Sequence, residues 1–146
     1  MTSTALHPIT LDEFSQFPNL EESPAWEFFN GQVLQKPMPT FHHSCLQKRL
    51  VTAIDSTNSP YEAFPELRCI LSQNSIVPDI TVIHQSRIPT DNQPIQGAPN
   101  WLIEILSPVF LPDQPLRLLS GNRLLPVLNE MALELTPNQV FGWLQR

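Results

Sequence analysis

The chain of 146 residues is poor in basic residues, with 8 Lys and Arg against 14 Asp and Glu and a formal net charge of −6. Non-specific binding of nucleic acid depends on neutralising phosphates with Lys and Arg, so this composition argues against a broad nucleic-acid surface. Lys36, Lys48 and Arg49 lie near one another, but without the interleaved aromatic residues of a single-strand platform. Divalent cations bound by carboxylates would offset part of the repulsion, so metal-dependent nucleases are not excluded.

Cysteines and long apolar runs are also scarce. Cys45 and Cys69 provide neither a disulfide framework nor metal-ligand spacing, and we expect both to be small buried apolar residues. No apolar run approaches the ~20 residues that span a bilayer, and the start of the chain lacks the features of a signal peptide. We therefore expect no membrane partner and, by default, a cytoplasmic protein. The length and ordinary composition predict one globular domain over residues 1–146.

Local patterns predict a short helix and a hairpin in the first third of the chain. Thr10 precedes Glu13 by three residues, the spacing of a capping box, which indicates a helix over residues 11–16 that ends near Pro18. Asn30-Gly31 lies between β-prone runs and has the composition of a type I′ turn. It predicts two antiparallel strands, at 25–29 and 32–36.

The remaining patterns predict a main helix, further strands and a closing helix. Residues 44–56 carry an apolar face formed by Leu46, Leu50, Val51 and Ile54. Residues 66–71 and 75–84 flank a turn at 72–74 as a second hairpin, the apolar run 101–107 is typical of a central strand, and 87–100 reads as a loop. Thr136, Pro137 and Gln139 have the capping pattern of a closing helix.

Two acidic residues lie within these apolar strands. In the stretch "SIVPDITVI" the side chain of Asp79 shares a strand face with Val77 and Thr81, and in "LIEIL" Glu104 faces away from its isoleucine neighbours. If the strands are neighbours, the two carboxylates converge at one point. An unpaired buried carboxylate is costly, and binding of a divalent cation is a frequent reason for such a residue.

Four stretches carry a family resemblance over nearly the whole chain: "WEFFNGQVLQKPMPTFHHSCLQKRL", "ELRCILSQNSIVPDI", "PNWLIEILSP" and "LPVLNEMALELTPNQVFGWL". They resemble the Uma family of putative restriction endonucleases, members of the PD-(D/E)XK nuclease superfamily. The ordered pair of Pro-Asp and Glu-Ile-Leu-Ser-Pro is the most specific part. The resemblance implies an α/β, restriction-endonuclease-like fold with a mixed central sheet flanked by helices. It also implies hydrolysis of DNA phosphodiester bonds with Mg²⁺ or Mn²⁺.

The resemblance also implies roles for individual residues. Asp79 matches the metal-binding aspartate and Glu104 the second acid, with the backbone carbonyl of Ile105 as a further metal ligand. Glu27 matches the acid before the hairpin turn, and His43 matches the histidine that opens the first long helix. Asp79, Glu104, Glu27 and His43 are therefore the candidate catalytic residues, and Asp79, Glu104 and Ile105 the candidate metal ligands.

Each of these residues also has a purely structural interpretation. Asp79 could accept backbone hydrogen bonds, and Glu104 could form an ion pair with Arg68 on a neighbouring strand. Glu27 is equally consistent with an exposed strand residue, and His43 with an ordinary first-turn residue. For the metal site, we expect Asp79→Asn to abolish stabilisation by metal with little loss of stability without metal, because removing a charge from an acidic cluster without a cation relieves repulsion.

The chain departs from the superfamily pattern at one important position. The superfamily usually has a lysine two residues after the second acid, where Leu106 stands here, and this chain has no lysine beyond Lys48. Arg117 or Arg123 could supply charge, but neither position matches. Since a cationic group can contribute ~10²–10³ in rate, we expect slow or no cleavage unless Lys36, Lys48 or an arginine takes this role. A degenerate member that serves as a binding module or homodimeric assembly module is the alternative.

A second departure lies between about Pro108 and Pro112, where a segment present in the family is missing. Either the gene carries an internal deletion, or the natural protein contains an additional segment there. An intact mass of 16.6 kDa for the natural protein would indicate the deletion, and a larger mass would indicate the additional segment.

Overall fold

The computed structural model describes residues 8–106, 119 and 121–145. Both the region between Pro108 and Pro112 and the later residue Arg117 lie outside the described residues. The α-helices are α1 (Leu11–Ser15), α2 (Phe41–Asp55) and α3 (Pro137–Gly142), with one 3₁₀ helix, η1 (Gln85–Arg87). The strands are β1 (Trp26–Phe29), β2 (Gln32–Gln35), β3 (Tyr61–Pro65), β4 (Cys69–Ile70), β5 (Ser75–Ile76), β6 (Ile80–His84), β7 (Ile95–Gln96) and β8 (Trp101–Ile103).

The strands form two sheets. A five-stranded sheet has the order β2-β1-β5-β4-β7, and a three-stranded sheet has the order β3-β6-β8. All pairs are antiparallel except β4 with β7, so the larger sheet is mixed. The expected α/β class, with a mixed sheet flanked by helices, is confirmed.

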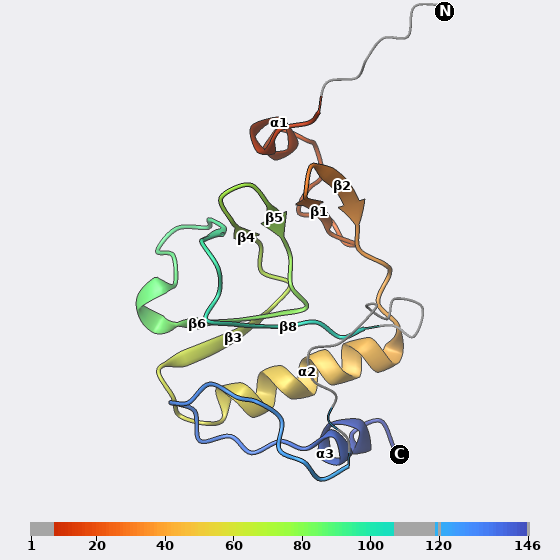
Figure 1. Ribbon diagram of the computed structural model, residues 1–146, viewed down its shortest axis with the longest axis vertical. Coiled ribbons are helices and arrows are strands. Elements are labelled where there is room, and N and C mark those ends of the chain that lie inside the picture. The colour runs from red at the N-terminus through yellow and green to blue at the C-terminus, as the bar shows by residue number, and fades with distance from the viewer. Residues whose placement is uncertain (1–7, 107–118, 120, 146) are drawn as a thin grey trace, which may run out of the picture.

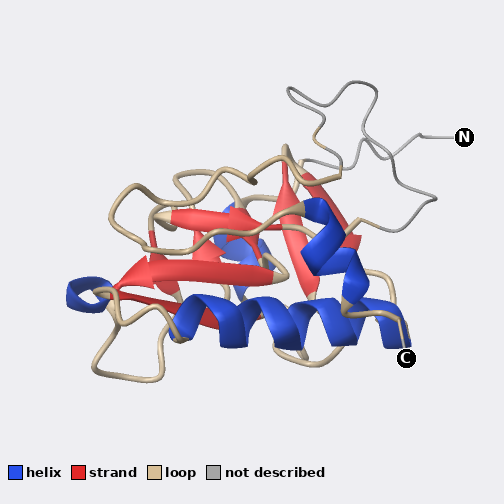
Figure 2. Ribbon diagram, turned by 90° about the horizontal axis from the view of Figure 1, so that it is seen from below, coloured by secondary structure: helices blue, strands red, loops and turns tan. Residues whose placement is uncertain are grey.

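The main helix α2 organises the core. Figures 1 and 2 show it running along the three-stranded sheet, and the C-terminal segment with α3 lies on its other side in Figure 1. Leu46, Leu50 and Ile54 are buried, as the apolar face predicts, and they pack with Ile80 and Val82 of β6. The helix therefore places its first turn next to Asp79, at the start of β6.

The predicted N-terminal hairpin is confirmed. Asn30 and Gly31 have φ values of 50° and 77°, as a type I′ turn requires. The pairing extends past β2, because the Lys36 N–H donates to the Ala25 carbonyl at 2.9 Å. Lys36 thus leaves the hairpin with a fixed backbone direction.

The predicted strand 75–84 is wrong as a single element. Its first part, β5, forms the expected hairpin with β4 in the larger sheet, whereas β6 belongs to the three-stranded sheet. The break falls at Val77, Pro78 and Asp79. Proline has no backbone N–H to donate to a strand ladder, so the chain changes sheets there.

The predicted central strand 101–107 is also wrong in position and length. Only Trp101–Ile103 is a strand, and within the described part of the chain β8 pairs on one side only, with β6. Leu102, Glu104 and Leu106 are exposed, while Trp101, Ile103 and Ile105 are half-buried. This alternation is typical of a strand with one buried face rather than of a central strand.

The end of the described chain agrees with its sequence pattern. Thr136 caps α3, Pro137 opens the helix and Gln139 completes the capping box. Within the loop predicted at 87–100, the structure adds the two-residue strand β7, parallel to β4. Cys69 is buried and Cys45 half-buried. No helix among the described residues is long or apolar enough to cross a membrane.

The N-cap of α2 gives a testable consequence of this fold. The Thr40 side chain accepts a hydrogen bond from the His43 backbone N–H at 3.2 Å. We expect Thr40→Ala to lower the free energy of unfolding by about 1 kcal/mol, measured by urea denaturation, because one helix N–H loses its partner. Thr40→Ser keeps the acceptor and serves as the control; an equal loss in both variants would contradict the capping role.

Candidate functional site

Asp79 lies at the junction of the two sheets, and its carboxylate is almost completely buried, with 3% of the side chain exposed. One oxygen, Oδ1, accepts from Lys36 Nζ at 2.8 Å. The other, Oδ2, accepts from the Ile105 backbone N–H at 2.7 Å and lies 3.2 Å from His43 Nε2. The carboxylate therefore contacts groups from three separate segments of the chain, two of which donate hydrogen bonds to it.

Lys36 brings a positive charge into the site from the end of the hairpin. Its Nζ donates to the Val77 carbonyl at 2.6 Å and lies 3.4 Å from Glu104 Oε2, in addition to its bond with Asp79. Only 12% of its side chain is exposed, so water screens these interactions weakly. Lys36, from the segment after β2, thus brings an ammonium group to the two acids, although Leu106 stands where the superfamily pattern has its lysine.

Glu104 meets Asp79 across two neighbouring strands, as the parity of the sequence predicts. The register pairs Ile80 with Ile103, so the next positions in the antiparallel ladder are Asp79 and Glu104. Both carboxylates contact the same Lys36 Nζ. The two acids differ in environment, because 39% of the Glu104 side chain is exposed.

His43 lies in the first turn of α2 and its ring reaches Asp79. Nε2 faces Asp79 Oδ2 at 3.2 Å, whereas Nδ1 is buried and has no hydrogen-bond partner within the described chain. The Nε2 side of the His43 ring therefore lies against the Asp79 carboxylate.

Two further side chains hold the backbone around Asp79. Glu27 Oε1 accepts from the Val77 N–H at 2.8 Å, and Gln47 Nε2 donates to the Asp79 carbonyl at 2.8 Å. Glu27 is therefore more than an exposed strand residue, because it fixes the segment in which the chain changes sheets. Sequence reasoning missed Gln47; its only signal is its position four residues after His43, on the same face of α2.

The electrostatic environment separates the two acids. Burial would raise the pKa of Asp79, but the hydrogen bonds from Lys36 and the Ile105 N–H outweigh it and lower that pKa. For Glu104, burial raises the pKa to about 7, and the negative charge of Asp79 adds to this effect while Lys36 opposes it. Burial would lower the pKa of Lys36, but its bond to Asp79 and the nearby carboxylates raise it.

The other sequence expectations at the site have definite outcomes. The alternative pairing of Glu104 with Arg68 is wrong: Arg68 binds Glu21 Oε1 at 3.0 Å, together with Ser75 and two backbone carbonyls. His42 is exposed, and His84 contacts Ser86, away from the acids. Lys48 and Arg123 are exposed, and no ion pair in the described chain joins either to Asp79 or Glu104.

The donor set suits a hard cation. Asp79 and Glu104 offer carboxylate oxygens that converge on one point, and Mg²⁺ is often bound by one or two carboxylates together with water and substrate phosphate. The described residues contain no group of three or more His, Cys, Asp and Glu side chains that could hold a metal ion. The described residues therefore form no closed cage of protein ligands, and Lys36 Nζ lies at the point on which the two carboxylates converge.

Comparison with known proteins points to nucleases. The sequence profile of the Uma2 family, described as putative restriction endonuclease, matches residues 11–109. The chain is also similar to the crystal structure of a putative nuclease from Anabaena variabilis, with 33% identity and a TM-score of 0.79 over 94% of this chain and 99% of that chain. No protein with a curated description matches.

The contacts of Asp79 alter the expected result of replacing it. The premise of an acidic cluster without a cation is wrong, because Lys36 lies between the acids. We expect Asp79→Asn to lower the free energy of unfolding by roughly 3 kcal/mol without added metal, since it breaks a buried ion pair. Asp91→Asn, at an exposed loop residue, is the control. A small effect at both positions in urea denaturation would contradict the importance of the ion pair.

The raised pKa of Glu104 makes the free energy of unfolding depend on pH, with a sign opposite to that of an acid whose pKa is lowered, such as Asp79. Its pKa rises from the usual 4.5 to about 7 on folding, so between these values the folded state binds more protons than the unfolded state. The free energy of unfolding therefore falls as pH rises through this window. The shifts of Asp79 and Lys36 act below and above it.

We expect Glu104→Gln to remove this contribution, so that the variant gains stability relative to the wild type from pH 4.5 to 7. Urea denaturation of both proteins in a chelator, at several pH values, measures the difference. A constant difference across the window would show that the Glu104 carboxyl does not change its protonation on folding.

Proposed function

The chain belongs to the Uma2 family of putative restriction endonucleases, and from that premise we propose that it hydrolyses phosphodiester bonds of DNA with the help of Mg²⁺ or Mn²⁺. The observation that carries the proposal is the convergence of Asp79 and Glu104 on the ammonium group of Lys36. Two carboxylates and one buried cation at the same point are the groups that phosphodiester hydrolysis needs.

Asp79 and Glu104, with the Ile105 carbonyl, would hold the divalent cation. When bound, the cation supplies polarisation of the phosphoryl oxygens and makes water a better nucleophile. Asp79 is oriented for this task by His43 and by the Ile105 N–H, and its backbone is held by Gln47. Glu104 is the more exposed acid, so it is the one that solvent and substrate reach first.

Lys36 supplies the charge that the sequence pattern lacks at Leu106. Phosphoryl transfer places negative charge on the phosphate oxygens, and a fixed ammonium group in a weakly screened site stabilises that charge. Coulomb attraction depends on the distance between charges and on the medium, not on the order of residues along the chain. A lysine on the strand end after β2 can therefore take the role of a lysine two positions after Glu104.

A second function has its own supporting observation. Lys36 already pairs with both acids, and a lysine that satisfies them permanently would compete with a divalent cation. In that case the fold is a degenerate nuclease that acts as a binding module or as a homodimer. The homodimer and the cytoplasmic location remain predictions.

Cleavage assays with matched lysine variants separate the two functions. We expect the wild type to cut DNA with Mg²⁺ or Mn²⁺ and to stop in a chelator. Lys36→Met should lose ~10²–10³ in rate, because a charge that stabilises the transition state is removed. Lys48→Met removes an exposed lysine from α2 and should retain the wild-type rate.

Thermal unfolding with added metal completes the test. Because Lys36→Met also removes the partner of Asp79, rates are compared at a temperature at which every variant is folded. For the nuclease, metal stabilises the wild type by mass action, and Glu104→Gln weakens this effect. Absence of cleavage, combined with metal stabilisation that appears only in Lys36→Met, would instead establish the degenerate module.

A further inference from the structure

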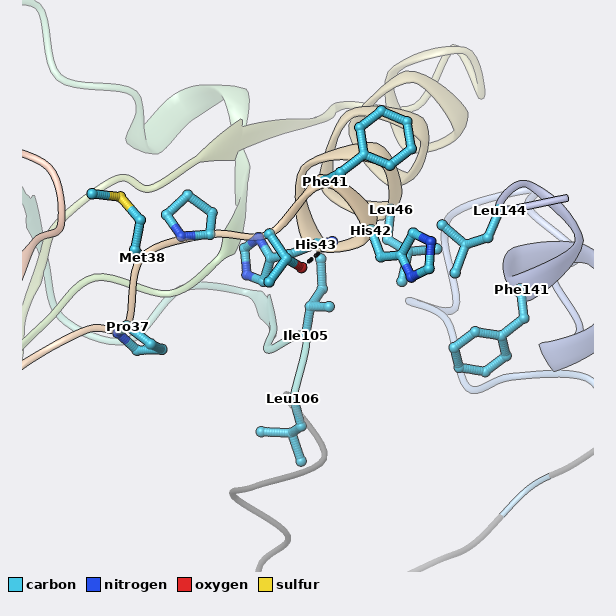
Figure 3. A pocket seen from close by; sticks show the side chains of 12 residues that line it. Pro37, Met38, Phe41, His42, His43, Leu46, Ile105, Leu106, Phe141 and Leu144 are labelled. Carbon is cyan, nitrogen blue, oxygen red and sulfur yellow. Dashed lines mark hydrogen bonds between the residues drawn. The ribbon is translucent and has the colours of Figure 1, made fainter. Parts of the chain in front are cut away.

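An apolar pocket of about 600 Å³ opens directly beside the acidic site. Its walls come from the segment that joins β2 to α2, from the first turns of α2, from the residues after β8 and from α3 with the residues that follow it (Figure 3). The residues that line it are Pro37, Met38, Pro39, Thr40, Phe41, His42, His43, Leu46, Ile105, Leu106, Phe141 and Leu144.

The pocket begins where the acidic site ends. Pro37 follows Lys36 in the chain, and Ile105 follows Glu104, so two walls continue directly from the charged residues. His43 belongs to both, since its ring contacts Asp79 and also lines the pocket. A molecule whose phosphate lies at Asp79 and Glu104 would therefore extend its uncharged part into this pocket.

Among the residues that the structure describes, the lining has no carboxylate and no lysine or arginine, although the chain as a whole carries a net charge of −6. It presents large apolar side chains to solvent, and Phe141 is 59% exposed. A contiguous apolar patch that is exposed to solvent often marks a binding site. A polyanion in this pocket would meet no carboxylate among the described lining residues.

We infer that this pocket binds a nucleobase of an unpaired nucleotide whose phosphate lies at the proposed metal site of Asp79 and Glu104; the inference rests on the proposed function. A base carries no charge and has a flat π-face, which suits apolar and aromatic walls. Bases in a duplex are stacked away from such a pocket, so the substrate it favours is single-stranded. A duplex would instead require a broad basic surface, which eight basic residues do not provide.

Binding is measured separately from cleavage. Fluorescence anisotropy in Mg²⁺ with the Glu104→Gln protein compares three probes: a labelled single strand of about 12 nucleotides, the same sequence as a duplex, and a base-free sugar-phosphate chain of equal length. We expect the single strand to bind at least tenfold more tightly than either of the others. Adding Phe141→Ala should weaken single-strand binding about tenfold.

Phe29→Ala, at another exposed phenylalanine outside the pocket, is the matched control and should have no effect. Equal binding of the three probes, or no effect of Phe141→Ala, would overturn the inference. It would also be overturned if sedimentation showed that Phe141→Ala converts a dimer into a monomer while oligonucleotide binding stays the same, because the pocket would then serve self-association.

The two proposals fail in different ways. Metal-dependent cleavage by the wild type, without any dependence of binding on Phe141, would leave the nuclease function standing and remove the pocket. Single-strand binding that depends on Phe141, without cleavage under any metal condition, would retain the pocket as a binding site and remove the nuclease function.

Discussion

The carboxylate of Asp79 is the constraint on which the rest of the site depends. A carboxylate with 3% of its side chain exposed has lost most of its hydration, and the protein must replace that water with donors. Those donors are Lys36 after β2 and the Ile105 N–H after β8, and the His43 ring of α2 lies against the same carboxylate. The hairpin, the main helix and the end of the three-stranded sheet are therefore connected through one side chain.

The same constraint explains why Pro78 matters. The chain crosses from the larger sheet to the smaller one at this proline, and the Val77 N–H that would otherwise lie at a strand end is bound by Glu27. Gln47 then holds the carbonyl of Asp79. The backbone on both sides of the proline is fixed by side chains, which keeps the acid at the junction and opposite Glu104 rather than within a regular ladder.

Net charge and local charge lead to different conclusions about partners. The net charge of −6 argues against binding of a long polyanion across the whole surface of the protein. Locally, however, Lys36 pairs with the acids, and the described lining of the adjoining pocket contains no carboxylate, lysine or arginine. Because Lys36 pairs with two carboxylates, the site is not a basic surface, and the apolar pocket beside it suits the short nucleotide contact proposed above better than an extended duplex interface.

By itself the sequence determined the local elements and the pairing of the two acids: Asn30-Gly31 requires a tight turn, the spacing of Leu46, Leu50 and Ile54 requires one buried helix face, and strand parity directs Asp79 and Glu104 toward one point. It did not determine the split of residues 75–84 between two sheets, the edge position of β8, the partner of Arg68 or the arrival of Lys36 at the acids. Local patterns depend on neighbours within a few residues, and they are readable because backbone geometry is local. Lys36 lies 43 residues from Asp79 and 68 from Glu104, so only the packing of the hairpin against the sheet junction decided that its ammonium group would lie between the two acids.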